Sequence, residues 1–92
     1  MKAPRFDLGR VVATPGALEA LILVRDSPAT FLARHAVGDW GDLDEDDRRE
    51  NDRSLEYGCR LLSAYQLPDG SKIWIITEAD RSSTTILLPG EY

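Results

Sequence analysis

The chain has 92 residues, of which 42% are hydrophobic and 29% are charged. These fractions exclude a disordered chain, and the length predicts one α+β domain, over residues 1–92, with a thin core. The N-terminal sequence has no apolar segment typical of a secretory signal, and no apolar run approaches the roughly 20 residues that cross a bilayer. We therefore expect a cytoplasmic protein with no membrane segment.

The net charge of −5 is unevenly distributed. Residues 39–56 contain nine acidic and three basic residues, which gives −6, whereas the other residues sum to +1. Direct binding of DNA or RNA depends on Lys and Arg that neutralise phosphates, and the acidic segment opposes it. The single cysteine, Cys59, excludes an internal disulfide and a zinc site built on thiolates. We expect its side chain to be a small buried apolar group.

The first part of the chain predicts one strand and two helices. Residues 5–13 favour extended backbone. Each helix is expected to begin at a Thr-Pro or Ser-Pro pair, because the hydroxyl accepts from a free N–H and proline tolerates the first helical position. The expected helices run from Pro15 to about Asp26 and from Pro28 to Val37.

A third helix is expected over residues 43–57, after a glycine-bounded corner at 38–41. Asp42 is the expected N-cap, and Glu45 stands where the acceptor of a capping box belongs. Two ion pairs at i,i+4 spacing, Asp44 with Arg48 and Glu45 with Arg49, would each add roughly 0.2–0.5 kcal/mol. This helix has few apolar residues, so we expect it on the surface.

The last third predicts three strands joined by short connections. The strands cover residues 60–67, 71–77 and 84–88, and Pro68-Asp69-Gly70 is typical of a turn. Short connections favour an antiparallel meander. The predicted fold class is therefore α+β in the order β-α-α-α-β-β-β, with the helices packed on one face of a curled antiparallel sheet of three to four strands.

The acidic segment does not fit a calcium-binding loop. Asp42, Asp44 and Asp46 occupy positions 1, 3 and 5 of an EF-hand pattern. Position 6, which needs glycine, is Asp47, and position 12, which needs glutamate, is Arg53. We predict no calcium site.

His35 is the only histidine, and Asp39 follows it by four residues. A catalytic base also needs a nucleophile and oxyanion donors, and zinc needs three or four ligands. We expect a half-buried His35 near a helix C-terminus, where the helix dipole favours its protonated form. Glu78 and Asp80 are expected in a polar turn, which could alternatively form a recognition surface with Trp74. No catalytic residue, cofactor or metal is predicted.

Two stretches, GDWGDLDEDDRREN and WIITEADRSSTTILLPGEY, resemble a family of small bacterial proteins carried on plasmids and integrated mobile elements. The resemblance extends from VATPGALEAL to LLPGEY. Members are mostly uncharacterised, and some are labelled type I restriction enzyme modification subunits. The resemblance implies a mobile-element context and no known activity. This chain lacks a glycine-rich cofactor loop and an Asn/Asp-Pro-Pro-aromatic motif, so no catalytic residues are carried over.

The leading hypothesis is a non-enzymatic accessory domain that binds another protein. The candidate partner surface comprises Trp40, Asp42, Asp44, Asp46 and Asp47, although a tryptophan at a glycine-bounded corner can instead anchor the loop to the core. The alternative is an acidic DNA mimic that inhibits a restriction or defence nuclease, although its acids lie within about 18 residues and alternate with arginines. A small enzyme is a third hypothesis. A homodimer is compatible with the thin core and the strand edges.

Overall fold

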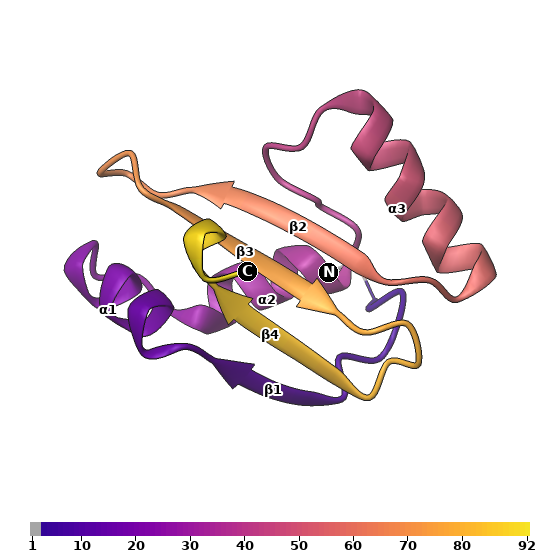
Figure 1. Cartoon of the computed structure of the whole chain (residues 1–92), viewed down its shortest axis with the longest axis horizontal. Helices are drawn as coiled ribbons and strands as arrows, with labels where there is room; N and C mark the ends of the chain where they lie inside the picture. Colours follow the sequence, from indigo (N-terminus) through magenta and orange to yellow (C-terminus); the bar gives the residue numbers. More distant parts are fainter. Residues whose placement is uncertain (1–2) are drawn as a thin grey trace.

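A computed structural model describes residues 3–92, which form one four-stranded sheet with three α-helices (Figure 1). The elements are β1 (Arg10–Ala13), α1 (Pro15–Leu23), α2 (Pro28–Ala36), α3 (Glu45–Tyr57), β2 (Leu61–Gln66), β3 (Lys72–Thr77), β4 (Ser83–Leu87) and a short 3-10 helix, η1 (Pro89–Glu91). This order confirms the predicted β-α-α-α-β-β-β arrangement and the α+β class. Residues 1 and 2 of the predicted domain lie outside the described part.

The sheet is mixed, so the expectation of a wholly antiparallel sheet is wrong. Its strand order is β1-β4-β3-β2, in which β2, β3 and β4 are antiparallel neighbours and β1 runs parallel to β4. The cause is the long helical connection from β1 to β2, which is a crossover and returns the chain in the same direction. Two reversals in the meander then bring β4 back to the direction of β1.

The hydrophobic core lies between one face of the sheet and the helices α1 and α2 (Figure 1). Successive strand residues point to opposite faces, so alternate side chains of β3 and β4 enter this core. Fully burying such a side chain contributes roughly 1.5–3 kcal/mol. The core consists of Ala17, Leu21, Phe31, Tyr65, Leu67, Ile73, Ile75 and Ile86.

The first two helices begin where the sequence predicts. The hydroxyl of Thr14 accepts from the N–H of Ala17 at 3.1 Å, and the hydroxyl of Ser27 accepts from the N–H of Ala29 at 3.2 Å. Each helix has its proline in the first turn. The first helix ends at Leu23, earlier than expected.

The third helix begins later than predicted, and its N-cap is Asp44 rather than Asp42. The Asp44 carboxylate accepts from the N–H of Asp47 at 2.8 Å. Glu45 forms no capping box but does form the predicted ion pair with Arg49, at 2.8 Å. The predicted pair of Asp44 with Arg48 is absent from the described residues, since Arg48 donates to backbone carbonyls instead.

The helix starts late because residues 40–42 first run extended along the outer edge of β2. The N–H of Ala64 donates to the Trp40 carbonyl at 3.1 Å, and the N–H of Asp42 donates to the Ala64 carbonyl at 2.6 Å. Asn51 on α3 then bonds both backbone groups of Leu62, at 2.5 and 3.1 Å. The helix α3 consequently lies beside the β2 edge and not on the face that α1 and α2 cover (Figure 1).

Gly41 makes this edge pairing possible, and its replacement gives the first prediction. Its φ is +76°, and an added Cβ would lie 2.0 Å from the carbonyl oxygen of Ala64. Gly58 has a similar φ of +72° with no atom within 4 Å of such a Cβ. We expect Gly58→Ala to cost about 1–2 kcal/mol of unfolding free energy from backbone strain alone. Gly41→Ala should cost at least about 2 kcal/mol more, as measured by urea unfolding.

The comparison between the two alanine variants separates strain from overlap. Equal losses of stability in Gly41→Ala and Gly58→Ala would show that the corner does not depend on close approach to Ala64.

Candidate functional site

Trp40 lies in the interior, so of its two expected roles it has that of an anchor of the corner and not that of a residue on a partner surface. Its side chain is 3% exposed. The indole is stacked on Phe6 with ring centroids 6.2 Å apart and meets His35 edge-on at 5.6 Å. Its Nε1–H donates to Asp52 at 3.1 Å. Trp40 anchors the 38–41 corner to the sheet and to α3.

The four aspartates predicted with Trp40 are all exposed, but two of them already accept hydrogen bonds from the backbone of this chain. Asp42 accepts from the N–H of Gln66 at 2.7 Å, which covers the last part of the β2 edge, and Asp44 caps α3. Asp46 and Asp47 remain on the exposed surface of α3 and form no ion pair within residues 3–92. The predicted partner surface is therefore reduced to these two carboxylates and their helical neighbours.

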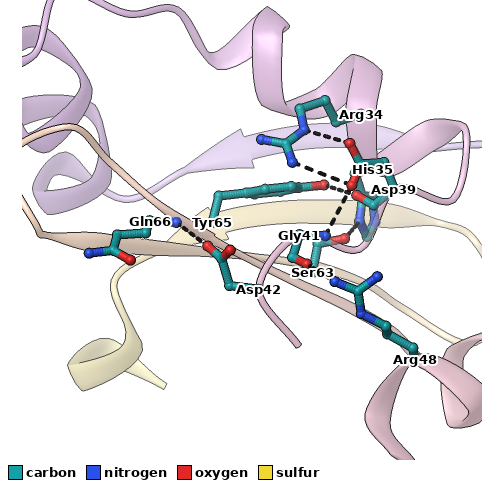
Figure 2. A network of polar contacts seen from close by, with 9 residues as sticks. All are labelled: Arg34, His35, Asp39, Gly41, Asp42, Arg48, Ser63, Tyr65 and Gln66. Carbon is teal, nitrogen blue, oxygen red and sulfur yellow. Dashed lines mark hydrogen bonds and ion pairs between the residues drawn. The ribbon is translucent and has the colours of Figure 1, made fainter. Parts of the chain in front are cut away.

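Figure 2 shows the polar network that fixes the corner against β2. Arg34 donates to the Asp39 carboxylate at 2.7 Å, and the same carboxylate accepts from the N–H of Gly41 at 3.2 Å. Tyr65 donates its hydroxyl to the Asp39 carbonyl at 2.6 Å. The Arg34 guanidinium is the main cause of the lowered pKa of Asp39. Asp39 thus holds the corner and does not pair with His35.

His35 is completely buried, and the expectation of a half-buried, protonated imidazole is wrong. Its Nδ1 lies 2.5 Å from the Ser63 hydroxyl, and its Nε2 lies 2.9 Å from the Thr77 hydroxyl. The network continues from Thr77 to Thr84, and Thr84 donates to the carbonyl of Leu8 at 2.7 Å. Burial, and then the charge of Arg81, lowers the pKa of His35 to about 4. His35 is therefore a neutral structural group that no substrate can reach.

Cys59 and the polar turn at Asp80, the other groups considered from the sequence, form no common site within residues 3–92. Cys59 is exposed and not buried as expected, because it lies in the connection between α3 and β2, outside any strand. Asp80 accepts from the N–H of Ser82 at 3.0 Å and closes the β3–β4 turn, as predicted for a polar connection. Arg81 donates to the carbonyls of Ser54 and Cys59 and joins that turn to the end of α3.

A groove that the sequence did not predict lies on the face of the sheet opposite α1 and α2. There η1 and the last residue pass over the sheet (Figure 1). Trp74 and Tyr92 meet with ring centroids 5.8 Å apart, and the guanidinium of Arg60 lies over the Tyr92 ring at 5.2 Å. The hollow has a volume of about 450 Å³ and is lined by Arg60, Leu62, Trp74, Ile76, Pro89 and Tyr92.

A second hollow of about 160 Å³ lies beside the first one, next to α3. Arg60 and Leu62 line both hollows, so the two hollows are adjacent. The new wall contains the carboxylates of Asp47 and Glu50. We call the two hollows together the open-face groove. It has an aromatic end at Trp74 and Tyr92 and an acidic end at Asp47 and Glu50.

Comparison with known proteins leaves the site to be interpreted from its geometry. Searches against protein-family models, curated proteins and solved structures found no match to this chain. Within residues 3–92, no group of three or more His, Cys, Asp or Glu side chains is placed to hold a metal ion. No helix in that range is long and apolar enough to cross a membrane.

The burial of His35 makes stability depend on pH. The folded chain keeps the imidazole neutral down to a pKa of about 4, whereas the unfolded chain binds the proton near pH 6.5. Acid between these values therefore stabilises only the unfolded state. We expect the free energy of unfolding to fall by about 2–3 kcal/mol from pH 7 to pH 4.5, measured by urea unfolding at each pH.

His35→Gln is the matched variant, because an amide can bond hydroxyls but does not titrate. It should lose most of the decrease between pH 7 and pH 4.5, because the carboxylates with a lowered pKa bind protons in the unfolded chain only near pH 4.5 and below. NMR titration of the imidazole in the native chain gives an independent measurement. A midpoint near 6.5 in the folded protein would contradict the prediction.

Proposed function

We propose that this domain is a non-enzymatic protein-interaction module whose open-face groove binds an extended segment of a partner protein. The observation that carries the proposal is that an aromatic hollow at Trp74 and Tyr92 and a hollow with an acidic wall at Asp47 and Glu50 are adjacent and share Arg60 and Leu62. Such a groove fits a segment that presents an apolar side chain beside a basic one.

The aromatic end supplies the apolar contact. Trp74 is half-buried, and Tyr92 is 57% exposed, so both rings have surface left to cover. Tryptophan, tyrosine and arginine are the residue types that dominate binding energy at protein interfaces. Arg60 already donates to the Tyr92 hydroxyl, and within residues 3–92 it forms no ion pair with Asp47 or Glu50.

The acidic end supplies the charge preference. The helix α3 has six acidic residues and three arginines, and the carboxylate of Asp47 is without an ion pair in the described residues. A partner Lys or Arg beside Asp47 would be attracted at long range and oriented on contact. The groove thus selects a basic segment over an acidic one.

The alternatives have less support from the geometry. His35 is buried, Asp39 is bonded within the corner, and neither lines the open-face groove, so within residues 3–92 these two candidate catalytic groups do not meet in a hollow. A DNA mimic needs a long row of free carboxylates, but α3 spans only about 20 Å at 1.5 Å per residue. Along it, Glu45 pairs with Arg49 and Glu50 pairs with Arg53.

A displayed library of random linear peptides tests the proposal without knowledge of the natural partner. We expect enrichment of peptides that combine Lys or Arg with an aromatic, aliphatic or proline residue. Tyr92→Ala or Trp74→Ala should weaken an enriched peptide at least about tenfold. Asp47→Asn should weaken it a few-fold, and added salt should reduce the effect of that substitution.

Glu56→Gln is the matched control for Asp47→Asn, since both remove one exposed carboxylate from α3 but Glu56 does not line the groove. Equal effects of the two variants would show that only the overall charge matters. Failure to enrich any peptide, together with protection of DNA from a restriction nuclease by the domain, would overturn the proposal in favour of DNA mimicry.

A further inference from the structure

We propose that two copies of this chain associate through β1, whose free edge pairs with the same edge of the second copy in antiparallel orientation. This surface is separate from the open-face groove, because β1 and β2 are the opposite edges of the sheet.

The free edge follows from the parallel ladder between β1 and β4. The N–H of Arg10 donates to Ser82, and the N–H of Thr14 donates to Ile86. Alternate residues of a strand bond to one neighbour, so the backbone groups of Val11 and Ala13 point away from β4. No other described residue bonds them. The β2 edge differs, because Trp40, Asp42 and Asn51 cover it.

Exposed aliphatic side chains are concentrated beside this edge. On β1, Val11 and Val12 are 43% and 40% exposed. On α1, which begins two residues after β1, the exposed side chains are Leu18, Ile22 and Leu23. Every large aliphatic side chain exposed in residues 3–92 lies on these two elements, since the other exposed large hydrophobics are tyrosines. A second copy that pairs with β1 would cover part of this aliphatic surface.

Charge favours a second copy at this surface. Residues 10–26 contain two arginines, one glutamate and one aspartate, so their net charge is zero, although the chain carries −5. Two copies can therefore approach through β1 and α1 without local repulsion. An approach through α3 would bring two acidic helices together.

The β1 sequence is complementary to itself in one register. Pairing Val12 with Val12 of the second copy places Val11 opposite Ala13, and Ala13 opposite Val11, as hydrogen-bonded pairs. Arg10 then faces Thr14, so no like charges are opposed. Because the β2 edge is covered, no further copy can add to the sheet. The association is an isologous dimer and closes at two copies.

Sedimentation of the full chain across concentrations from about 1 µM to about 1 mM tests the association. The mass should rise from 10.2 kDa toward twice that value. Val12→Lys should raise the dissociation constant at least about tenfold, because the register sets the two lysines opposite each other. Gln66→Lys, which adds the same single charge at an exposed position on the opposite edge strand, should leave a dimer. A chain that stays monomeric at every concentration would overturn the proposal.

A mixing experiment tests the register. Val12→Lys and Val12→Glu should each be monomeric alone and should form a heterodimer when mixed, because residue 12 meets residue 12 of the partner copy. A dimer that neither variant disrupts, or variants that fail to pair on mixing, would overturn pairing through β1. Hydrogen exchange reports on the β1 edge in the native, folded chain, without any substitution. The amides of Val11 and Ala13 should gain protection with concentration, while the amide of Thr14 stays protected by Ile86 throughout.

Discussion

The pairing of residues 40–42 with Ala64 at the β2 edge is the constraint on which the rest of the structure depends. It turns the indole of Trp40 inward, where that ring packs against His35. It directs the Asp42 carboxylate to Gln66 and delays α3 until Asp44. Because α3 then runs beside β2, its acidic side forms one wall of the open-face groove, and the β2 edge is covered. This short stretch of backbone pairing thereby leaves β1 as the free edge of the sheet and places the groove on the face opposite α1 and α2.

Local signals in the sequence predicted most of the elements. A Thr-Pro pair starts α1 and a Ser-Pro pair starts α2. Neither start depends on the surroundings, because the Thr or Ser hydroxyl accepts its hydrogen bond from the first turn of the same helix. Pairing over long distances in the chain has no such signal. The parallel contact of β1 with β4 joins residues more than seventy positions apart. Asp42 and Asp44 are equally good caps by residue type, and the tertiary contacts of residues 40–42 with Ala64 and Gln66 decide between them. A helix-dipole argument favours a charged His35, but the dominant effect is burial among strands that come later in the chain.

The candidate site was only partly predictable for the same reason. The predicted surface contained Asp47, which does line the open-face groove, and Trp40, which does not. Trp74 is flanked in the sequence by isoleucines, and the alternation of β3 places Trp74 and Ile76 on the groove side while Ile73 and Ile75 point into the core. Tyr92 lies beside Trp74 only because η1 brings the last residues over the sheet. No spacing in the sequence indicates that contact.

The two proposed surfaces are compatible, and their combination has a physical consequence. The open-face groove lies over β2 and β3, while β4 separates it from β1, so pairing through β1 covers neither groove of a dimer. A dimer would present two identical grooves related by a two-fold axis. A partner with two suitable segments could engage both, and the second contact would form at the effective concentration set by the first. An open-face groove that binds one short segment weakly would then be sufficient for stable association, which is consistent with a small domain whose exposed surfaces are each limited in area.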